Sequence, residues 1–158
     1  MTPAPNRPGW KLIDSTLREG EQFARAQFRL EDKIEIARAL DTFGIDYVEV
    51  TSPAASPQSA RDAREIVKLG LGAKVITHAR CVVDDVQAAI DTGVGGVGML
   101  FATSRILRES SHGKSIQQIV DLMAPPIELA VRAGLEVRFS AEDAFRTEVP
   151  DLLTVYRQ

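Results

Sequence analysis

The sequence predicts an α/β fold in which about five β/α units with parallel strands form a partial TIM (β/α)8 barrel. Short apolar segments alternate with helical patterns along the chain, an order typical of parallel sheets with right-handed crossovers. Most predicted helices end at a glycine, where a C-terminal cap belongs. The last predicted strand has one polar face, which favours a barrel interior near its mouth. With 158 residues, the chain is shorter than the ~250 residues of a whole barrel.

The elements follow one another in regular order after a proline-rich start. Residues 1–10 contain three prolines and no apolar periodicity, which predicts a flexible leader before a single domain over 11–158. The apolar stripe over 30–43 predicts a helix capped by Gly44. Pro125 and Pro126 are expected to kink or split the helix that contains them. The other expected elements are strands over 11–16, 45–51, 73–79, 96–101 and 135–141, and helices over 58–69, 82–92, 115–133 and 148–157.

Alternation in the last strand distinguishes a barrel from an open sheet. Arg138, Ser140 and Glu142 lie on one face, and Val137 and Phe139 lie on the other. A central strand of an open parallel sheet is covered by helices on both faces and is apolar on both. Glu49 and Thr51 repeat the polar face in the second strand, as Asp14 and Thr16 do in the first.

Composition narrows the class of protein. Hydrophobic residues make up 44% of the chain, enough for a packed core, and the net charge of −3 argues against phosphate-neutralising nucleic-acid binding. The chain has no run of ~18 apolar residues, and its start has no apolar signal-peptide region. One cysteine, Cys81, excludes an intramolecular disulfide. We therefore expect a soluble, cytoplasmic protein without nucleic-acid or membrane partners.

The densest chemical segment, residues 14–22, follows the first strand with the sequence Asp-Ser-Thr-Leu-Arg-Glu-Gly-Glu-Gln. Carboxylates bind hard divalent cations, and a guanidinium pairs with carboxylates or enolates. The alternative is a solvated charged loop. The segment follows a strand, where the active sites of barrels lie, and this place favours a metal- and substrate-binding site over a solvated loop.

These residues resemble a known family. The segment over 14–23 is similar to the signature of the acyl-condensing TIM-barrel metalloenzymes, which include isopropylmalate synthases, homocitrate synthases and hydroxymethylglutaryl-CoA lyases. The pair Arg18–Glu19 resembles the homocitrate synthases of the α-aminoadipate route to lysine. The segments over 50–59, 77–81 and 137–146 agree with this resemblance. It covers nearly the whole chain and corresponds to the N-terminal part of the family's barrel.

The resemblance implies an activity and a set of site residues. The activity is condensation of acetyl-CoA with 2-oxoglutarate to homocitrate, with a divalent metal (Mg²⁺, Mn²⁺ or Zn²⁺) and a homodimeric full-length enzyme. The implied roles are catalytic for Arg18 and Glu142, substrate-binding for Arg18, Gln22, Arg138 and Ser140, binding of the distal carboxylate of 2-oxoglutarate for His78, and metal ligation for Glu19.

Two departures leave alternatives open. The family completes its metal site with a later His-x-His pair, whereas the histidines here are His78 and His112. Gly98 replaces an acidic residue expected near the substrate and a lysine inhibitor. The alternatives are another 2-oxo acid acyltransferase, such as isopropylmalate or citramalate synthase, and a non-catalytic remnant. His78 taken alone could also be a hydrogen-bonded structural residue.

Other motifs have structural interpretations. Residues 93–98 fit the pattern G-x-G-x-x-G, but they end a helix and open a strand, the reverse of a dinucleotide site. The run Gly113-Lys114-Ser115 is not a phosphate loop, because Arg108 stands where the first glycine belongs. His112 is expected in a solvent-exposed loop, and Cys81 is expected to pack as a small apolar residue.

Overall fold

The computed structural model describes residues 9–158, so that most of the predicted leader, residues 1–8, lies outside the described residues. The strands are β1 (Ile13–Asp14), β2 (Tyr47–Val50), β3 (Lys74–Arg80), β4 (Gly96–Ala102) and β5 (Glu136–Glu142). The helices are α1 (Leu30–Phe43), α2 (Pro57–Val67), α3 (Val83–Ile90), α4 (Arg105–Leu107), α5 (Ile116–Arg132) and α6 (Val149–Tyr156). Shorter turns are the 3₁₀ segments η1 (Gly20–Gln22), η2 (Pro53–Ala55) and η4 (Ala144–Arg146) and the π-helical segment η3 (Arg108–His112).

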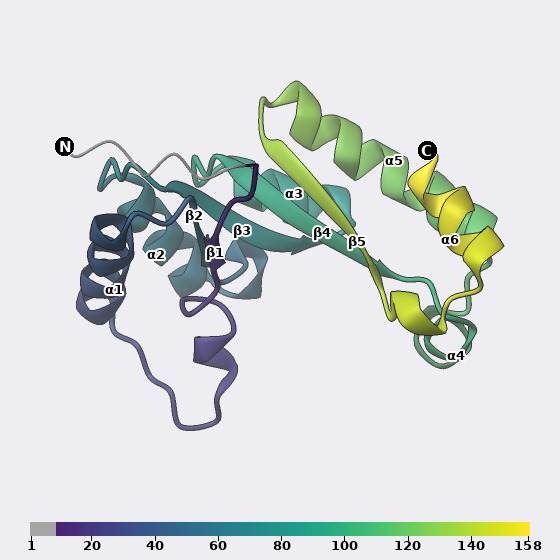
Figure 1. Cartoon of the computed structure of the whole chain (residues 1–158), viewed down its shortest axis with the longest axis horizontal. Helices are drawn as coiled ribbons and strands as arrows, with labels where there is room; N and C mark the ends of the chain where they lie inside the picture. The colour runs from purple at the N-terminus through teal and green to yellow at the C-terminus, as the bar shows by residue number, and fades with distance from the viewer. Residues whose placement is uncertain (1–8) are drawn as a thin grey trace.

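The strands form one parallel sheet in the order β1-β2-β3-β4-β5. Each strand therefore lies beside the one that follows it in the sequence. In a doubly wound sheet, by contrast, the strand order reverses at a switch point. Right-handed crossovers then place the helices on a single face. Figure 1 shows the sheet curling, with α1, α2, α3 and α5 following one another along its outside. The predicted partial barrel is confirmed as a curled half-barrel with edges at β1 and β5.

Most predicted elements agree with the structure to within a few residues. Helix α1 has the expected bounds, and Gly44 caps it in the left-handed conformation, with φ of 85°. Pro125 and Pro126 were expected to kink or split this helix; the split is wrong, because α5 continues through both. Proline removes the helical partners of the carbonyls of Asp121 and Leu122. Both residues lie on an exposed part of the helix, where water can take the place of the missing partners.

The apolar core lies between the sheet and the helices. Alternate strand residues face outward into it, and the opposite face carries the polar residues of β2 and β5. Buried members from the strands include Val48, Val50, Val75, Val97 and Met99, and those from the helices include Ala37, Ala63, Ile66, Val86, Ile119 and Ala130. This division leaves the inner face of the curl for polar chemistry.

The N-terminal ends of the strands are joined by a polar chain inside the curl. Lys11 Nζ donates to Tyr47 OH (2.8 Å), and Tyr47 OH donates to Glu136 Oε1 (2.7 Å). Lys74 Nζ donates to Glu136 Oε2 (2.6 Å). A Cβ on Gly96 would lie 2.9 Å from the Glu136 carbonyl oxygen, so glycine is needed for β4 and β5 to approach this closely. These contacts hold the strands together at their N-terminal ends, away from the C-terminal ends.

Candidate active site at the C-terminal ends of the strands

Strand register aligns two predicted site residues across the inner face. His78 on β3 is paired with Gly98 on β4, and Gly98 is paired with Arg138 on β5. Arg18 comes from the loop after β1, where the N–H groups of Arg18 and Glu19 donate to the Ser15 carbonyl (3.0 and 2.7 Å). This turn brings Arg18 over the sheet.

Glu49 on β2 is the centre of the charged cluster. Its side chain is only 2% exposed. Arg18 Nε donates to Glu49 Oε2 (2.8 Å), and Arg138 Nη2 donates to Glu49 Oε1 (3.3 Å). Sequence analysis placed Glu49 on the polar face but did not assign it to the site. The available signal was a single carboxylate in the otherwise uncharged strand Tyr-Val-Glu-Val.

The metal ligand implied by the resemblance, Glu19, lies beside this cluster. Its carboxylate is 53% exposed and pairs with Arg18 Nη1 (2.7 Å). The nearby Asp14 carboxylate accepts the N–H of Thr16 (2.8 Å). Among residues 9–158, no group of three or more His, Cys, Asp or Glu side chains could hold a metal ion. The described residues therefore do not fit a divalent metal by themselves.

The electrostatic environment of His78 keeps its imidazole neutral near pH 7. Burial is the largest influence and lowers the pKa of His78 below its ordinary value of 6.5. The positive charges of Arg18 and Arg138 lower this pKa further, against the opposing charges of Glu49 and Glu19. A neutral imidazole offers one N–H donor, which suits a hydrogen bond to a substrate carboxylate.

The remaining predicted site residues lie farther from Glu49, toward the solvent. Ser140 and Glu142 follow Arg138 at alternate positions on the same face of β5, and Glu142 is exposed at the strand end. Gln22 is exposed in η1. The structure thus gathers Arg18, His78 and Arg138 near Glu49, and it leaves Gln22 and Glu142 at the solvent side of the cluster.

A second charged cluster holds the loop after β1 against α1 and α2. Lys33 Nζ pairs with Glu21 Oε1 and with Asp62 Oδ2, both at 2.6 Å. Thr51 Oγ1 donates to Glu21 Oε2 (2.5 Å). Burial opposes protonation of Lys33, but the bonds to Asp62 and Glu21 outweigh it and raise the pKa of Lys33. The cluster borders an open cavity of about 500 Å³.

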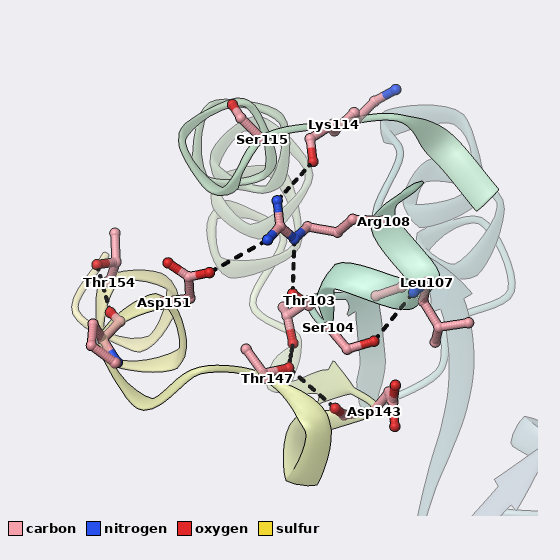
Figure 2. A network of polar contacts seen from close by, with 12 residues as sticks. Thr103, Ser104, Leu107, Arg108, Lys114, Ser115, Asp143, Thr147, Asp151 and Thr154 are labelled. Carbon is pink, nitrogen blue, oxygen red and sulfur yellow. Dashed lines mark hydrogen bonds and ion pairs between the residues drawn. The ribbon is translucent and has the colours of Figure 1, made fainter. Parts of the chain in front are cut away.

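A polar network joins the ends of β4 and β5, as Figure 2 shows. Arg108 donates to the carbonyls of Thr103 (Nε, 3.0 Å) and Lys114 (Nη1, 3.3 Å) and to Asp151 of α6 (Nη2, 3.4 Å). The hydroxyls of Thr103 and Thr147 are 2.7 Å apart. Sequence analysis missed this network, which attaches the segment after β4 to α6.

The structural interpretations of the other motifs mostly agree with the structure. Gly93 follows α3 and Gly96 opens β4, the context that argues against a dinucleotide site. Cys81 is buried, and burial raises the pKa of its thiol to about 12. The expectation for His112 is wrong: it is half-buried, its Nε2 is 3.1 Å from the Ala102 carbonyl oxygen, and its ring packs edge-on against Phe101. The unpredicted π-helical segment η3 folds this loop back onto β4.

The sequence of this chain is similar to those of known proteins. The family model described as HMGL-like matches residues 10–158. The chain belongs to this family. It is 54% identical over 152 residues to both the mitochondrial homocitrate synthase and the cytosolic isozyme of Saccharomyces cerevisiae. These matches cover 96% of the chain but 34% and 36% of those proteins, so the chain spans about a third of their length. The 2-isopropylmalate synthase of Methanocaldococcus jannaschii is 38% identical over 147 residues, which is 93% of the chain and 28% of that protein.

Solved structures of HMGL-like proteins share the fold. The HMG-CoA lyase of Bacillus subtilis superimposes with a TM-score of 0.70 over 95% of this chain and 54% of its own, at 19% identity. An HMG-CoA lyase from Acinetobacter baumannii, in complex with coenzyme A and 3-methylmalate, gives 0.71 over 93% and 52%, at 13% identity. At these identities the likeness concerns the fold alone. Within residues 9–158, no helix is long and apolar enough to cross a membrane.

Proposed function

We propose that the chain is the N-terminal part of a homocitrate synthase, which condenses acetyl-CoA with 2-oxoglutarate to form homocitrate and free CoA in lysine biosynthesis. The observation that carries this proposal is the 54% identity to two homocitrate synthases over 96% of the chain. The 2-isopropylmalate synthase matched over a similar length is only 38% identical. The charged cluster around Glu49 supplies the groups that a dicarboxylic oxo acid requires.

The proposed reaction has three steps. A base removes a proton from the acetyl methyl group, the resulting enolate attacks the keto carbon of 2-oxoglutarate, and the alkoxide that forms takes up a proton. Water then hydrolyses the thioester to release CoA. Arg18 is well suited to stabilise the enolate and the developing alkoxide, because a fixed guanidinium favours negative charge that forms beside it. We also propose that Glu142 is a catalytic residue; its carboxylate is solvent-accessible at the end of β5.

Substrate binding is assigned to groups near the cluster. Arg138 retains donors beyond its bond to Glu49, since its side chain is 49% exposed. His78 provides a neutral hydrogen-bond donor for the distal carboxylate of 2-oxoglutarate. Ser140 and Gln22 are the remaining proposed contacts, on the outer side of the same opening.

The proposal for the whole protein also includes its metal, its oligomeric state and its location in the cell. We propose Glu19 as one ligand of a divalent metal, Mg²⁺, Mn²⁺ or Zn²⁺, whose other ligands come from outside these 158 residues. The whole enzyme is proposed to be a homodimer. We propose a cytoplasmic location, which one of the two yeast relatives, the cytosolic isozyme, supports, whereas the other is mitochondrial.

A chimera tests the function. Residues 10–158 replace the matched segment of the cytosolic yeast homocitrate synthase, and CoA release is followed with a thiol reagent. The proposal predicts release that requires both acetyl-CoA and 2-oxoglutarate and is abolished by Arg18→Ala. A folded chimera that uses 2-oxoisovalerate instead would indicate an isopropylmalate synthase, and a folded chimera without any turnover would indicate a non-catalytic remnant.

A further inference from the structure

The loop after β1 carries three of the proposed site residues: Arg18, Glu19 and Gln22. None of residues 18–29 is buried, so the apolar core does not determine where most of this loop lies. Figure 1 shows the loop projecting away from the sheet before the chain enters α1. Apolar packing occurs at its two ends, where Leu17 is buried and Phe28 packs against the core. The position of the residues between these ends must depend on polar contacts.

Glu21 supplies those contacts. Its carboxylate accepts a hydrogen bond from Thr51 Oγ1 (2.5 Å), just after β2, and pairs with Lys33 Nζ of α1 (2.6 Å). The same nitrogen of Lys33 pairs with Asp62 Oδ2 of α2 (2.6 Å). The side chains of Glu21, Lys33 and Asp62 are 19%, 8% and 6% exposed. Water therefore screens these contacts little, and they hold the loop more firmly than an exposed ion pair would.

The surroundings of Lys33 show which partner would move without it. The loop, α1 and α2 line one open cavity of about 500 Å³, so side-chain packing does not fill the space between them. Without the ammonium group, the carboxylates of Glu21 and Asp62 would face each other at close range, and like charges repel. Asp62 belongs to a helix and accepts a second bond from Gln58 Nε2 (2.5 Å), whereas Glu21 belongs to the short turn η1. Glu21 would therefore yield, and the loop with it.

A displacement of Glu21 reaches Arg18 through consecutive hydrogen-bonded turns. The N–H groups of Arg18 and Glu19 donate to the Ser15 carbonyl, and the N–H of Gln22 donates to the Glu19 carbonyl (3.1 Å). Arg18 in turn reaches across to Glu49 through its Nε (2.8 Å). The contact between the loop and the charged cluster is thus made three residues before the contact between the loop and Lys33.

We propose that Lys33 is a positioning residue: by holding Glu21, it keeps the guanidinium of Arg18 on Glu49, beside the other residues of the site. Lys33 acts through the loop and contacts no reacting group. The catalytic consequence rests on the proposed function, because Arg18 is the group assigned there to stabilise the enolate and the alkoxide.

Three variants separate positioning from a general effect on stability. Lys33→Met leaves the two carboxylates without their shared cation. Glu21→Ala removes the loop's side of the cluster, while Lys33 stays paired with Asp62. The matched control is Asp62→Asn, which weakens the contact between α1 and α2 but leaves Lys33 paired with Glu21. Unfolding is monitored in parallel to show that each variant is folded.

Two measurements on the 158-residue chain report on the loop itself. Arg25 is exposed within the loop, so the initial rate of trypsin cleavage after it measures how readily the loop leaves its place. Loss of a charge-assisted hydrogen bond in Lys33→Met or Glu21→Ala should raise this rate about tenfold, and Asp62→Asn should stay within about twofold of wild type. Because Arg18 lowers the pKa of His78, its displacement should raise this pKa in an NMR titration, again with no effect of Asp62→Asn.

The chimera measures the catalytic consequence. Lys33→Met and Glu21→Ala should lower kcat/KM for CoA release about tenfold, and Asp62→Asn should leave it within about twofold of wild type.

The outcomes distinguish this inference from the proposed function. A cleavage rate and a His78 titration that Lys33→Met and Glu21→Ala leave unchanged would overturn the role of Lys33. Equal effects of all three variants would overturn it too, because they indicate general destabilisation, as would full activity of the first two in an active chimera. A wild-type chimera without turnover would instead overturn the proposed function, while the trypsin and NMR results would still decide whether Lys33 positions Arg18.

Discussion

Replacing Glu49 with glutamine tests whether one carboxylate holds the site's two guanidinium groups together. The change keeps the shape of the side chain and removes the charge that Arg18 and Arg138 share. Glu49 is 2% exposed and Arg18 is 18% exposed, so their contact is shielded from water, whereas Arg138 is 49% exposed and is screened. The bond to Arg18 should therefore account for most of the loss.

The magnitude follows from these two contacts. A charge-assisted hydrogen bond contributes about 1.5–3 kcal/mol, and an exposed ion pair contributes up to about 1 kcal/mol. Glu49→Gln should lower the free energy of unfolding by about 3 kcal/mol. At about 2–4 °C per kcal/mol for a chain of this size, the Tm should fall by roughly 6–12 °C in a thermal unfolding experiment.

The same variant has a signed effect on His78. Burial and then Arg18 lower the pKa of His78, and Glu49 raises it, so Glu49→Gln should lower this pKa further. An NMR titration of the two histidines measures the change, with His112 as an internal reference. The matched control is Glu136→Gln, which removes a 47%-exposed carboxylate at the opposite end of the sheet and should not alter His78. A Tm within about 2 °C of wild type, together with an unchanged His78 titration, would refute a central role for Glu49.

Other predictions concern activity and stability. The 158-residue chain alone should not release CoA at an enzymatic rate, because its described residues lack a metal site; turnover near ~1 s⁻¹ with Mg²⁺ or Mn²⁺ would contradict this. In the chimera, His78→Leu should shift kcat/KM from 2-oxoglutarate toward 2-oxoisovalerate, whereas an unchanged ratio would make His78 a structural histidine. Lys33→Met leaves Glu21 and Asp62 without their shared cation, and denaturant unfolding should show a loss of about 3 kcal/mol, against less than about 1 kcal/mol for the exposed control Lys68→Met. Because the pKa of His78 is lower in the folded chain than its ordinary 6.5, stability should decrease as pH falls below about 6.5, and His78→Leu should lessen this decrease; identical pH profiles would argue against it.

The fold was predictable because its signals are local. Alternating apolar and helical segments, terminal glycines and one polar strand face each reflect the conformation of a few residues. The split at Pro125 and Pro126 was mispredicted because the sequence does not reveal that the residues losing their helical partners lie on an exposed part of the helix. The folding of η3 onto β4 depends on contacts of His112 with Phe101 and Ala102, and no local pattern predicts them.

The site was predictable only in part. The motif after the first strand and the polar residues of the last one pointed to Arg18 and Arg138 as members of one site, by resemblance. That both bind Glu49 depends on which side chains meet across the curl, and sheet curvature determines this.

Two cross-curl contacts connect the stability of the half-barrel with its chemistry. Tyr47 and Glu49 are alternate residues of β2, and Glu136 and Arg138 are alternate residues of β5. Tyr47 bonds to Glu136 (2.7 Å) and Glu49 to Arg138 (3.3 Å), each pair spanning the two strands between them. Both contacts pass the inner face of β4 where its residues are glycines, Gly96 and Gly98. A Cβ at Gly96 would meet the backbone of β5, whereas the atoms nearest to a Cβ at Gly98 belong to the side chains of Arg138 and Glu49. Substitutions at Gly96 should therefore destabilise the fold more than substitutions at Gly98, because backbone atoms yield less easily than side-chain ends.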